Sequence, residues 1–171
     1  MTPQDESVPR ARLARSRAGL SWWLAGGLLL LDQASKLWAT QQLPPGDAIA
    51  FLPGLLQWRL VRNSGAAFSL LTGWTPLLAV ISLLVCAAVA LVLLRRPPSD
   101  TGSALALGFL LGGAAGNGLD RWRLGAVIDF LEFVPIQFPV FNIADVAINL
   151  AVLCFAIDAL AALRRESSRD A

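Results

Sequence analysis

The sequence contains no histidine, only two cysteines, and few charged residues, which make up 15% of its 171 residues. Without histidine, an imidazole base is excluded, and metal-assisted hydrolysis would have to rely on carboxylate ligands, so we disfavour it. Cys86 and Cys154 fall inside apolar segments, and we interpret them as buried, reduced thiols. Neither a basic nucleic-acid patch nor a glycine-rich phosphate loop is present, so we expect no nucleic-acid partner. The chemistry that remains belongs to carboxylates, and we expect no metal or cofactor.

Hydrophobic residues dominate what is present. They make up 56% of the chain, and the mean hydropathy is +0.60, far from the soluble average. Four apolar segments each approach the ~20 residues that cross a bilayer as a helix. They span about 20–40, 74–94, 102–121 and 141–163. We therefore expect a mainly α membrane protein in which a single domain, residues 20–163, contains four transmembrane helices.

Basic residues give this domain an orientation, because segments rich in arginine and lysine stay in the cytoplasm. Nine of the 14 basic residues lie on one predicted side: Arg10, Arg12, Arg15, Arg17, Arg95, Arg96, Arg164, Arg165 and Arg169. On the other side are Arg59, Arg62, Arg121 and Arg123. Both termini should therefore be cytoplasmic, with residues 1–19 forming a flexible extension and residues 164–171 a short tail.

The outer side is predicted to hold a small β-sheet, in the region of about residues 44–70. From Leu56 to Val61 apolar and mostly polar residues alternate, which is the period of a strand. We expect the face that carries Trp58 to rest on lipid. Residues 124–140 are apolar and interrupted by prolines, so we expect them to lie along the outer surface as a flap.

Charged residues occur inside the first predicted span. Asp32 and Lys36 are four residues apart, so they share a helix face and can form an ion pair. Because a charged side chain in lipid costs at least ~2.5 kcal/mol, the pair should face protein or a cavity. We favour a structural clamp between helices over direct catalysis. Ser35 and Lys36 do not form a serine–lysine nucleophile, because neighbours on a helix point about 100° apart.

The third predicted span combines glycines with polar residues. Gly108, Gly112 and Gly116 recur every fourth residue, a stripe that lets another helix pack closely. Asn117 lies deep in the span, so its amide needs a partner on another helix or on a ligand. Asp120 and Arg121 lie where the helix reaches the outer interface, and an ion pair that extends to water is the simplest interpretation of both.

The carboxylates of greatest interest come after this span. Asp129 lies between the apolar residues Ile128 and Phe130, and such apolar surroundings raise the pKa of a carboxyl group by desolvation. In the fourth span, Asn142, Asp145 and Asn149 form one polar stripe near the outer end. Asn63, on the outer side, is interpreted as a turn residue or as a donor to a bound peptide, and its local sequence favours the turn.

These residues leave three classes of function open. Two acids that share a site can hydrolyse a bond, one ionised to activate water and one protonated to donate, and Asp129 and Asp145 suit this chemistry. A small proton-coupled carrier would also use carboxylates inside the membrane. A non-catalytic membrane assembly factor is the third class.

Five stretches together resemble the signature blocks of the bacterial signal peptidase II family, the lipoprotein signal peptidases. They are residues 32–36, 63–68, 112–121, 127–130 and 141–145, in the order of the family. The resemblance implies a four-helix inner-membrane aspartic endopeptidase with a periplasmic sheet. Such an enzyme removes the signal peptide from diacylglyceryl-modified prolipoproteins, cutting before the lipidated cysteine.

The same resemblance assigns roles by motif position. It implies a catalytic dyad of Asp129 and Asp145, and Asp32 and Lys36 match the first block. Residues that support or line the site would be Asn63, Asn117, Asp120, Arg121 and Asn142. We expect the substrate and membrane lipid as partners, a monomeric enzyme, and an active site near the periplasmic face.

Overall fold

The structure, a computed structural model, describes residues 7–65, 73–136 and 138–167. Its four helices are α1 (Ser7–Gln42), α2 (Thr75–Arg95), α3 (Thr101–Leu124) and α4 (Ile143–Ser167), and its three strands are β1 (Ala48–Leu52), β2 (Leu56–Asn63) and β3 (Val127–Phe133). The predicted stretches at 1–6, 66–72 and 168–171 lie outside the described residues.

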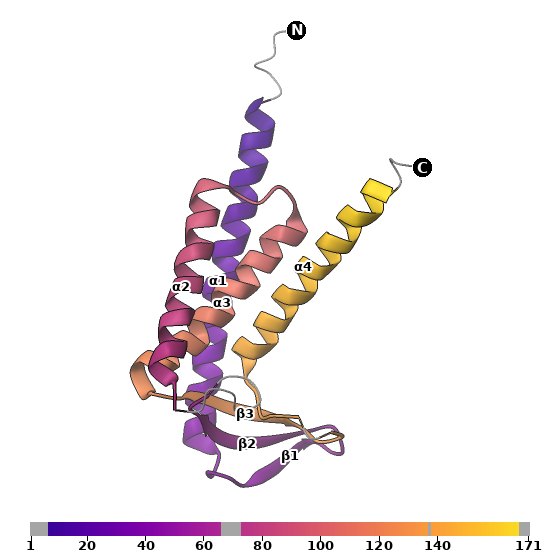
Figure 1. The fold of residues 1–171 in the computed structure, drawn as a ribbon. Helices are drawn as coiled ribbons and strands as arrows, with labels where there is room; N and C mark the ends of the chain where they lie inside the picture. The colour runs from indigo at the N-terminus through magenta and orange to yellow at the C-terminus, as the bar shows by residue number, and fades with distance from the viewer. Residues whose placement is uncertain (1–6, 66–72, 137, 168–171) are drawn as a thin grey trace.

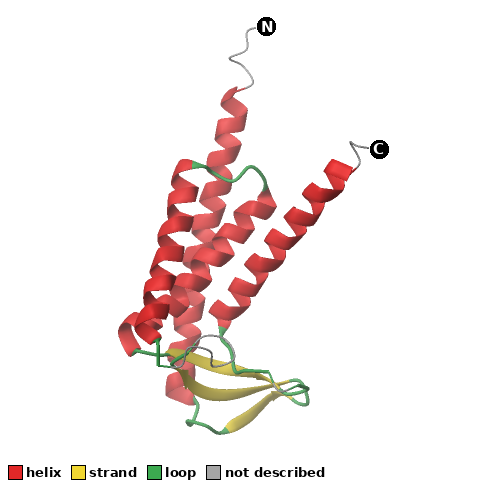
Figure 2. Ribbon diagram, viewed as in Figure 1, coloured by secondary structure: helices red, strands yellow, loops and turns green. Residues whose placement is uncertain are grey.

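The helices form a bundle and the strands form a sheet across one of its ends (Figures 1 and 2). Helix α3 packs against α1, α2 and α4, whereas α1 and α2 contact each other little. The start of α1 and the end of α4 lie at the end of the bundle away from the sheet (Figure 1). This arrangement places Asn117, Asp120 and Arg121, which lie near the C-terminal end of α3, next to the sheet.

Close helix packing follows the predicted glycine stripe. A Cβ atom at Gly112 would lie 2.9 Å from the Leu28 Cβ and 3.0 Å from the Ala25 carbonyl oxygen of α1. On the neighbouring face, a Cβ at Gly113 would lie 2.6 Å from the Ala144 carbonyl oxygen of α4. The prediction of a close-packing stripe is confirmed, and it brings α1 and α4 against neighbouring faces of α3.

Among the described residues, three helices are long and apolar enough to cross a membrane: α2, α3 and α4. Helix α1 is not among them, and it carries Asp32, Gln33 and Lys36 along the part that packs on α3. Because it runs beside the three apolar helices (Figure 1), a fourth span remains a prediction. Helix α1 begins at Ser7, so part of the extension predicted at residues 1–19 is helical, as expected for its alternation of arginine, alanine and leucine.

The sheet is antiparallel, in the order β1-β2-β3, and confirms the predicted strand around Trp58. The direction of its aromatic face differs from the prediction. The Trp58 ring lies 5.0 Å from that of Trp38 on α1, 4.5 Å from that of Phe51, and 6.0 Å from that of Phe130, measured between ring centroids. Trp58 therefore packs on protein and not on lipid, because the end of α1 reaches the sheet and covers it.

Much of the predicted flap is instead the edge strand β3, paired with β2. Val127, Ile128 and Phe130 are each 2% exposed. The run of β-branched and aromatic residues has the composition of a strand, and its backbone groups find partners in β2, in Phe141 and in the Asp120 carboxylate. Beyond this strand, Phe141 pairs with Leu131, so the chain returns along the sheet before α4 begins. Residue 137, within the predicted flap, lies outside the described residues.

Candidate functional site

Asp129 and Asp145 line the same cavity, which has a volume of about 590 Å³. Asp129 lies in strand β3, and Asp145 lies in the first turn of α4. The strand and the helix meet because Phe141, just before α4, pairs with Leu131 at the end of β3. Two carboxyl groups that are 16 positions apart in the sequence are thereby brought to one site.

Asn142 connects the two carboxyl groups. Its Nδ2 donates to Asp129 Oδ1 at 2.6 Å, while its backbone N–H donates to Asp145 Oδ2 at 3.1 Å. In return, the Asp145 backbone N–H donates to Asn142 Oδ1 at 3.0 Å. This reciprocal pair is the geometry of a capping box at the start of α4. The helical stripe predicted for Asn142 did not include this capping role, although the Asn-x-x-Asp spacing carries the signal for it.

Asn117 supplies the second link. Its Nδ2 donates to Asp145 Oδ1 at 2.7 Å, and its Oδ1 accepts from Asn142 Nδ2 and from Lys36 Nζ, each at 3.0 Å. Asn117 is 5% exposed, so the partners that its depth required all come from neighbouring segments of this chain. The hydrogen bonds fix the amide so that its nitrogen faces Asp145.

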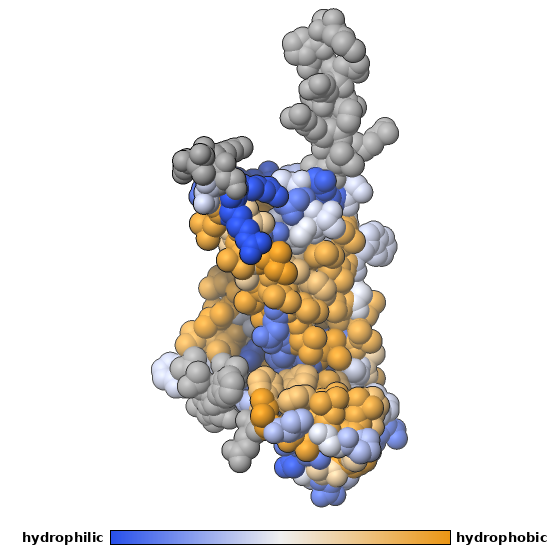
Figure 3. Space-filling view, turned by 90° about the vertical axis from the view of Figure 1, so that its right-hand side faces the viewer, coloured by the Kyte–Doolittle hydropathy of each residue, from blue (hydrophilic) through white to orange (hydrophobic). Residues whose placement is uncertain are grey.

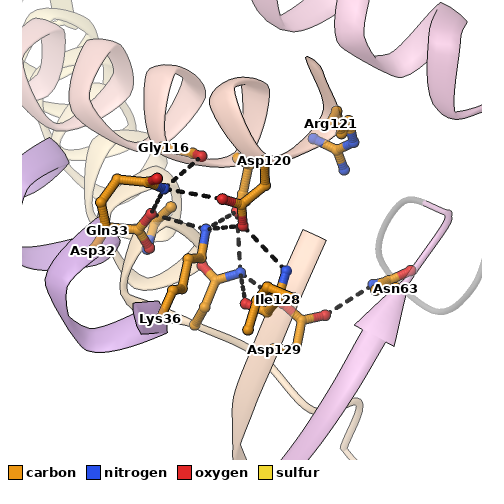
Figure 4. A network of polar contacts seen from close by, with 12 residues as sticks. Asp32, Gln33, Lys36, Asn63, Gly116, Asp120, Arg121, Ile128 and Asp129 are labelled. Carbon is orange, nitrogen blue, oxygen red and sulfur yellow. Dashed lines mark hydrogen bonds and ion pairs between the residues drawn. The ribbon is translucent and has the colours of Figure 1, made fainter. Parts of the chain in front are cut away.

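Lys36 lies behind the dyad, in the polar network drawn in Figure 4. Its Nζ is 2.8 Å from Asp32 Oδ2 and 2.9 Å from Asp120 Oδ2. Asp32, Lys36 and Asp120 are 1%, 3% and 2% exposed. The pair predicted from the spacing of Asp32 and Lys36 is therefore present, and it links α1 to α3 through Asp120.

Asp120 and Arg121 do not form the interfacial ion pair that the sequence suggested. Asp120 points into the protein toward Lys36, whereas Arg121 lines the cavity and its Nη2 donates to the Gly65 carbonyl oxygen at 3.2 Å. Adjacent helical residues point in different directions, so only one of them can face the buried cation. The Arg121 Nε is buried and has no hydrogen-bond partner among the described residues.

Asn63 forms a turn and also contacts Asp129, while the donation to a bound peptide considered from the sequence stays a prediction. Its Oδ1 accepts from the Gly65 backbone N–H at 2.9 Å, which is an Asx turn and confirms the favoured interpretation. Its Nδ2 donates to Asp129 Oδ2 at 3.0 Å. Both Asp129 oxygens therefore accept from an asparagine amide, one from β2 and one from the start of α4.

Burial changes the acidity of Asp129. Desolvation, followed by the charge of Asp145, raises the pKa of Asp129 from 3.8 to about 7, although the Asn63 and Asn142 amides and the charge of Lys36 oppose the change. The sequence prediction that its apolar neighbours would raise the pKa by desolvation is confirmed. Near neutral pH, a substantial fraction of Asp129 is therefore protonated.

Apart from Asn149, the third member of the polar stripe in the predicted fourth span, the remaining wall of the cavity is apolar. Val146, Leu150 and Leu153 contribute from α4, and Phe138, Pro139 and Val140 from the segment before it. Viewed from the side of α4, hydrophilic residues interrupt the apolar surface where the bundle meets the sheet (Figure 3). The cavity therefore joins a carboxylate site to a surface suited to lipid or to an apolar helix.

Comparisons with known proteins agree with this arrangement. The model of the family described as signal peptidase (SPase) II matches residues 24–161. The chain belongs to the signal peptidase II family. It is 55% identical over 147 residues to a lipoprotein signal peptidase of a Synechococcus species, covering 84% of this chain and 97% of the relative. A lipoprotein signal peptidase of Parasynechococcus marenigrum is 52% identical over 135 residues, covering 79% of this chain and 85% of the relative.

Solved structures are similar over most of the fold. One, described as a bacterial membrane enzyme, superposes with a TM-score of 0.79 at 28% identity, covering 90% of this chain and 92% of the other. A second of the same description has a TM-score of 0.75, covering 83% of this chain and 93% of the other. Membership of a peptidase family makes this chain a membrane protease, and the carrier considered from the sequence is not supported.

Proposed function

We propose that this protein is an aspartic endopeptidase that removes the signal peptide from diacylglyceryl-modified prolipoproteins, cutting on the N-terminal side of the lipidated cysteine. The single observation that supports it most is the shared cavity of Asp129 and Asp145, which apolar side chains of α4 and of the segment before it also line. The names of the relatives supply the substrate class. An apolar wall suits a substrate whose signal helix and acyl chains both remain in the bilayer.

The proposed mechanism divides the work between the two acids. Asp129, with a pKa of about 7, supplies the protonated carboxyl. Asp145 removes a proton from water as the water oxygen attacks the scissile carbonyl carbon, while Asp129 hydrogen-bonds the carbonyl oxygen. When the tetrahedral intermediate collapses, the C–N bond breaks and the leaving nitrogen takes the proton that the water lost. The roles of Asn63, Asn117 and Asn142 are to hold these carboxyls in place, and Arg121 lines the substrate cavity.

The site would face the periplasm from the inner membrane. The end of the bundle away from the sheet contains the end of α2 with Arg95, and the last turn of α4 with Arg164 and Arg165, which favours a cytoplasmic location for that end. Because one chain contributes both aspartates, we expect the enzyme to act as a monomer surrounded by lipid.

The test is cleavage of a diacylglyceryl-modified prolipoprotein by the purified protein in detergent, read by mass spectrometry of the new N-terminus. The wild type should release a product that begins with the lipidated cysteine. Asp129→Asn and Asp145→Asn should each lower the rate by about 10²–10⁴-fold or more. The matched control is Asp47→Asn, because Asp47 is exposed in the turn before β1. A folded wild type that leaves the substrate intact, or dyad variants that cleave as fast as the control, would overturn the proposal.

A further inference from the structure

Two buried carboxylates hold the backbone of the two dyad segments. Asp32 Oδ1 accepts the backbone N–H of Ala144, the residue before Asp145, at 2.9 Å. Asp120 Oδ2 accepts the backbone N–H of Ile128, the residue before Asp129, at 3.1 Å. Neither carboxylate lines the cavity. Each dyad member is thus preceded by a residue whose amide is anchored to a charge outside the substrate site.

Both anchors are joined to each other. Lys36 Nζ contacts a carboxylate oxygen of Asp32 and of Asp120, and it also donates to Asn117, the amide that faces Asp145. Gln33 repeats the link, because its Nε2 donates to Asp120 Oδ1 at 3.0 Å and to Asp32 Oδ2 at 3.2 Å. Figure 4 shows Lys36 and Gln33 between the two carboxylates. The Lys36 ammonium therefore contacts three side chains. Each of them makes one further hydrogen bond, either to Asp145 itself or to the residue that precedes Asp129 or Asp145.

A clamp between two helices would not need this pattern. A buried ion pair is costly to desolvate and adds little net stability compared with apolar packing, so its presence is weak evidence for a stabilising role. Stability would also be served by contacts confined to α1 and α3, whereas these carboxylates reach forward to β3 and α4. The contacts favour a role in setting the geometry of the site.

We propose that Asp32, Lys36 and Asp120, bridged also by Gln33, form one positioning unit that fixes the separation of the Asp129 and Asp145 carboxyls. These four side chains are called the brace below, and all are positioning residues that touch no substrate. The inference rests on the proposed function and deepens it, because it names what holds the two acids in register. A misplacement of about 1 Å can cost ~10²-fold in rate, which is the scale on which such a unit would act.

The kinetic test compares Lys36→Gln, Asp32→Asn and Gln33→Leu with the wild type, and uses Asp100→Asn as the matched control. Asp100 caps α3 at the other end of the bundle through Ser103. Brace variants should lower kcat by roughly 10–10²-fold and leave KM within about twofold, because none of the substituted side chains lines the substrate cavity. Gln33→Leu removes no charge, so a lower kcat in this variant reports the arrangement of the acids and not the loss of the Lys36 charge near Asp129. The control should keep wild-type kcat. Folded brace variants that lose thermal stability but keep kcat, or that raise KM alone, would overturn the brace.

A second measurement does not depend on cleavage. Amide hydrogen exchange, resolved by NMR of the ¹⁵N-labelled protein, should show slow exchange at Ala144 and Ile128 in the wild type. Both amides should exchange faster in Lys36→Gln, whereas Asp32→Asn should change Ala144 more than Ile128. If Lys36→Gln does not fold, Gln33→Leu decides, because it removes the shared amide and keeps the ammonium. Unchanged exchange at both positions would overturn the brace. This result is independent of the cleavage assay, whose failure with the wild type would overturn the proposed function instead.

Discussion

The pKa of Asp129 makes the stability of the protein depend on pH. The carboxyl titrates near pH 3.8 when unfolded and near pH 7 when folded, so between these values the folded state binds the extra proton. Stability contributed by this proton is fully present below about pH 4 and declines as the pH rises toward 7. We expect the Tm of the wild type in detergent to fall across this interval relative to that of Asp129→Asn, which has no carboxyl to titrate.

The quantity to compare between the wild type and Asp129→Asn is the slope of Tm against pH, and not the absolute Tm. An amide at position 129 would set one of its own N–H groups against a donor from Asn63 or Asn142, so the variant carries a constant penalty at every pH. Parallel Tm profiles for the two proteins between pH 4 and 8 would contradict the assigned environment of Asp129.

Asn142 offers a second prediction at the scale of one side chain. Asn142→Ala removes the cap of α4 and the amide that holds Asp129. Loss of a helix cap costs typically ~1 kcal/mol, and here an acceptor of the dyad loses its donor as well. We expect a lower Tm together with a reduced kcat. Thr40→Ala is the control, because Thr40 is exposed on α1, lies outside the cavity, and its hydroxyl donates to the Leu37 carbonyl of its own helix. Equal Tm values for the two variants would be the contrary result.

At the scale of whole elements, the contact between α1 and α3 depends on glycine. Gly112→Ala would place its Cβ 2.9 Å from Leu28 and 3.0 Å from a backbone oxygen of α1, so the helices must separate. Overpacking of this kind costs typically ~1–3 kcal/mol. Gly27→Ala, on α1, meets nothing within 4 Å and should leave the Tm unchanged or slightly higher. Thermal unfolding of the two alanine variants measures the difference, and a wild-type Tm for Gly112→Ala would contradict the packing.

The elements themselves were largely predictable from sequence periodicity. The apolar runs, the alternation around Trp58 and the glycine stripe each depend on neighbours within a few residues, and each predicts its helix or strand. Strand β3 was missed because its apolar run lacks alternation, and only pairing with β2 defines it. The inward direction of Asp120 was missed for a similar reason: its partner Lys36 lies 84 positions away. Local pattern reveals a carboxylate near an interface, but the fold decides which way it points.

The molecule as a whole should be inserted in one orientation. We expect a cysteine introduced at Pro53, exposed at the sheet, to react with a membrane-impermeant maleimide from the outer side of the inner membrane. A cysteine at Pro97, exposed between α2 and α3, should react with the same maleimide only after the membrane is permeabilised. Both variants are made after Cys86 and Cys154 are replaced by alanine. Labelling of both positions from the same side would contradict the orientation.

The bond from Ala144 to Asp32 joins residues 112 positions apart, so it closes only when the last helix has met the first. During synthesis, a nascent chain that ends before α4 has neither Asp145 nor the hydrogen bonds that Asn142 gives to both acids. Under the proposed mechanism, a partly synthesised chain would therefore have no protease activity, and activity would begin only once α4 has inserted beside α1.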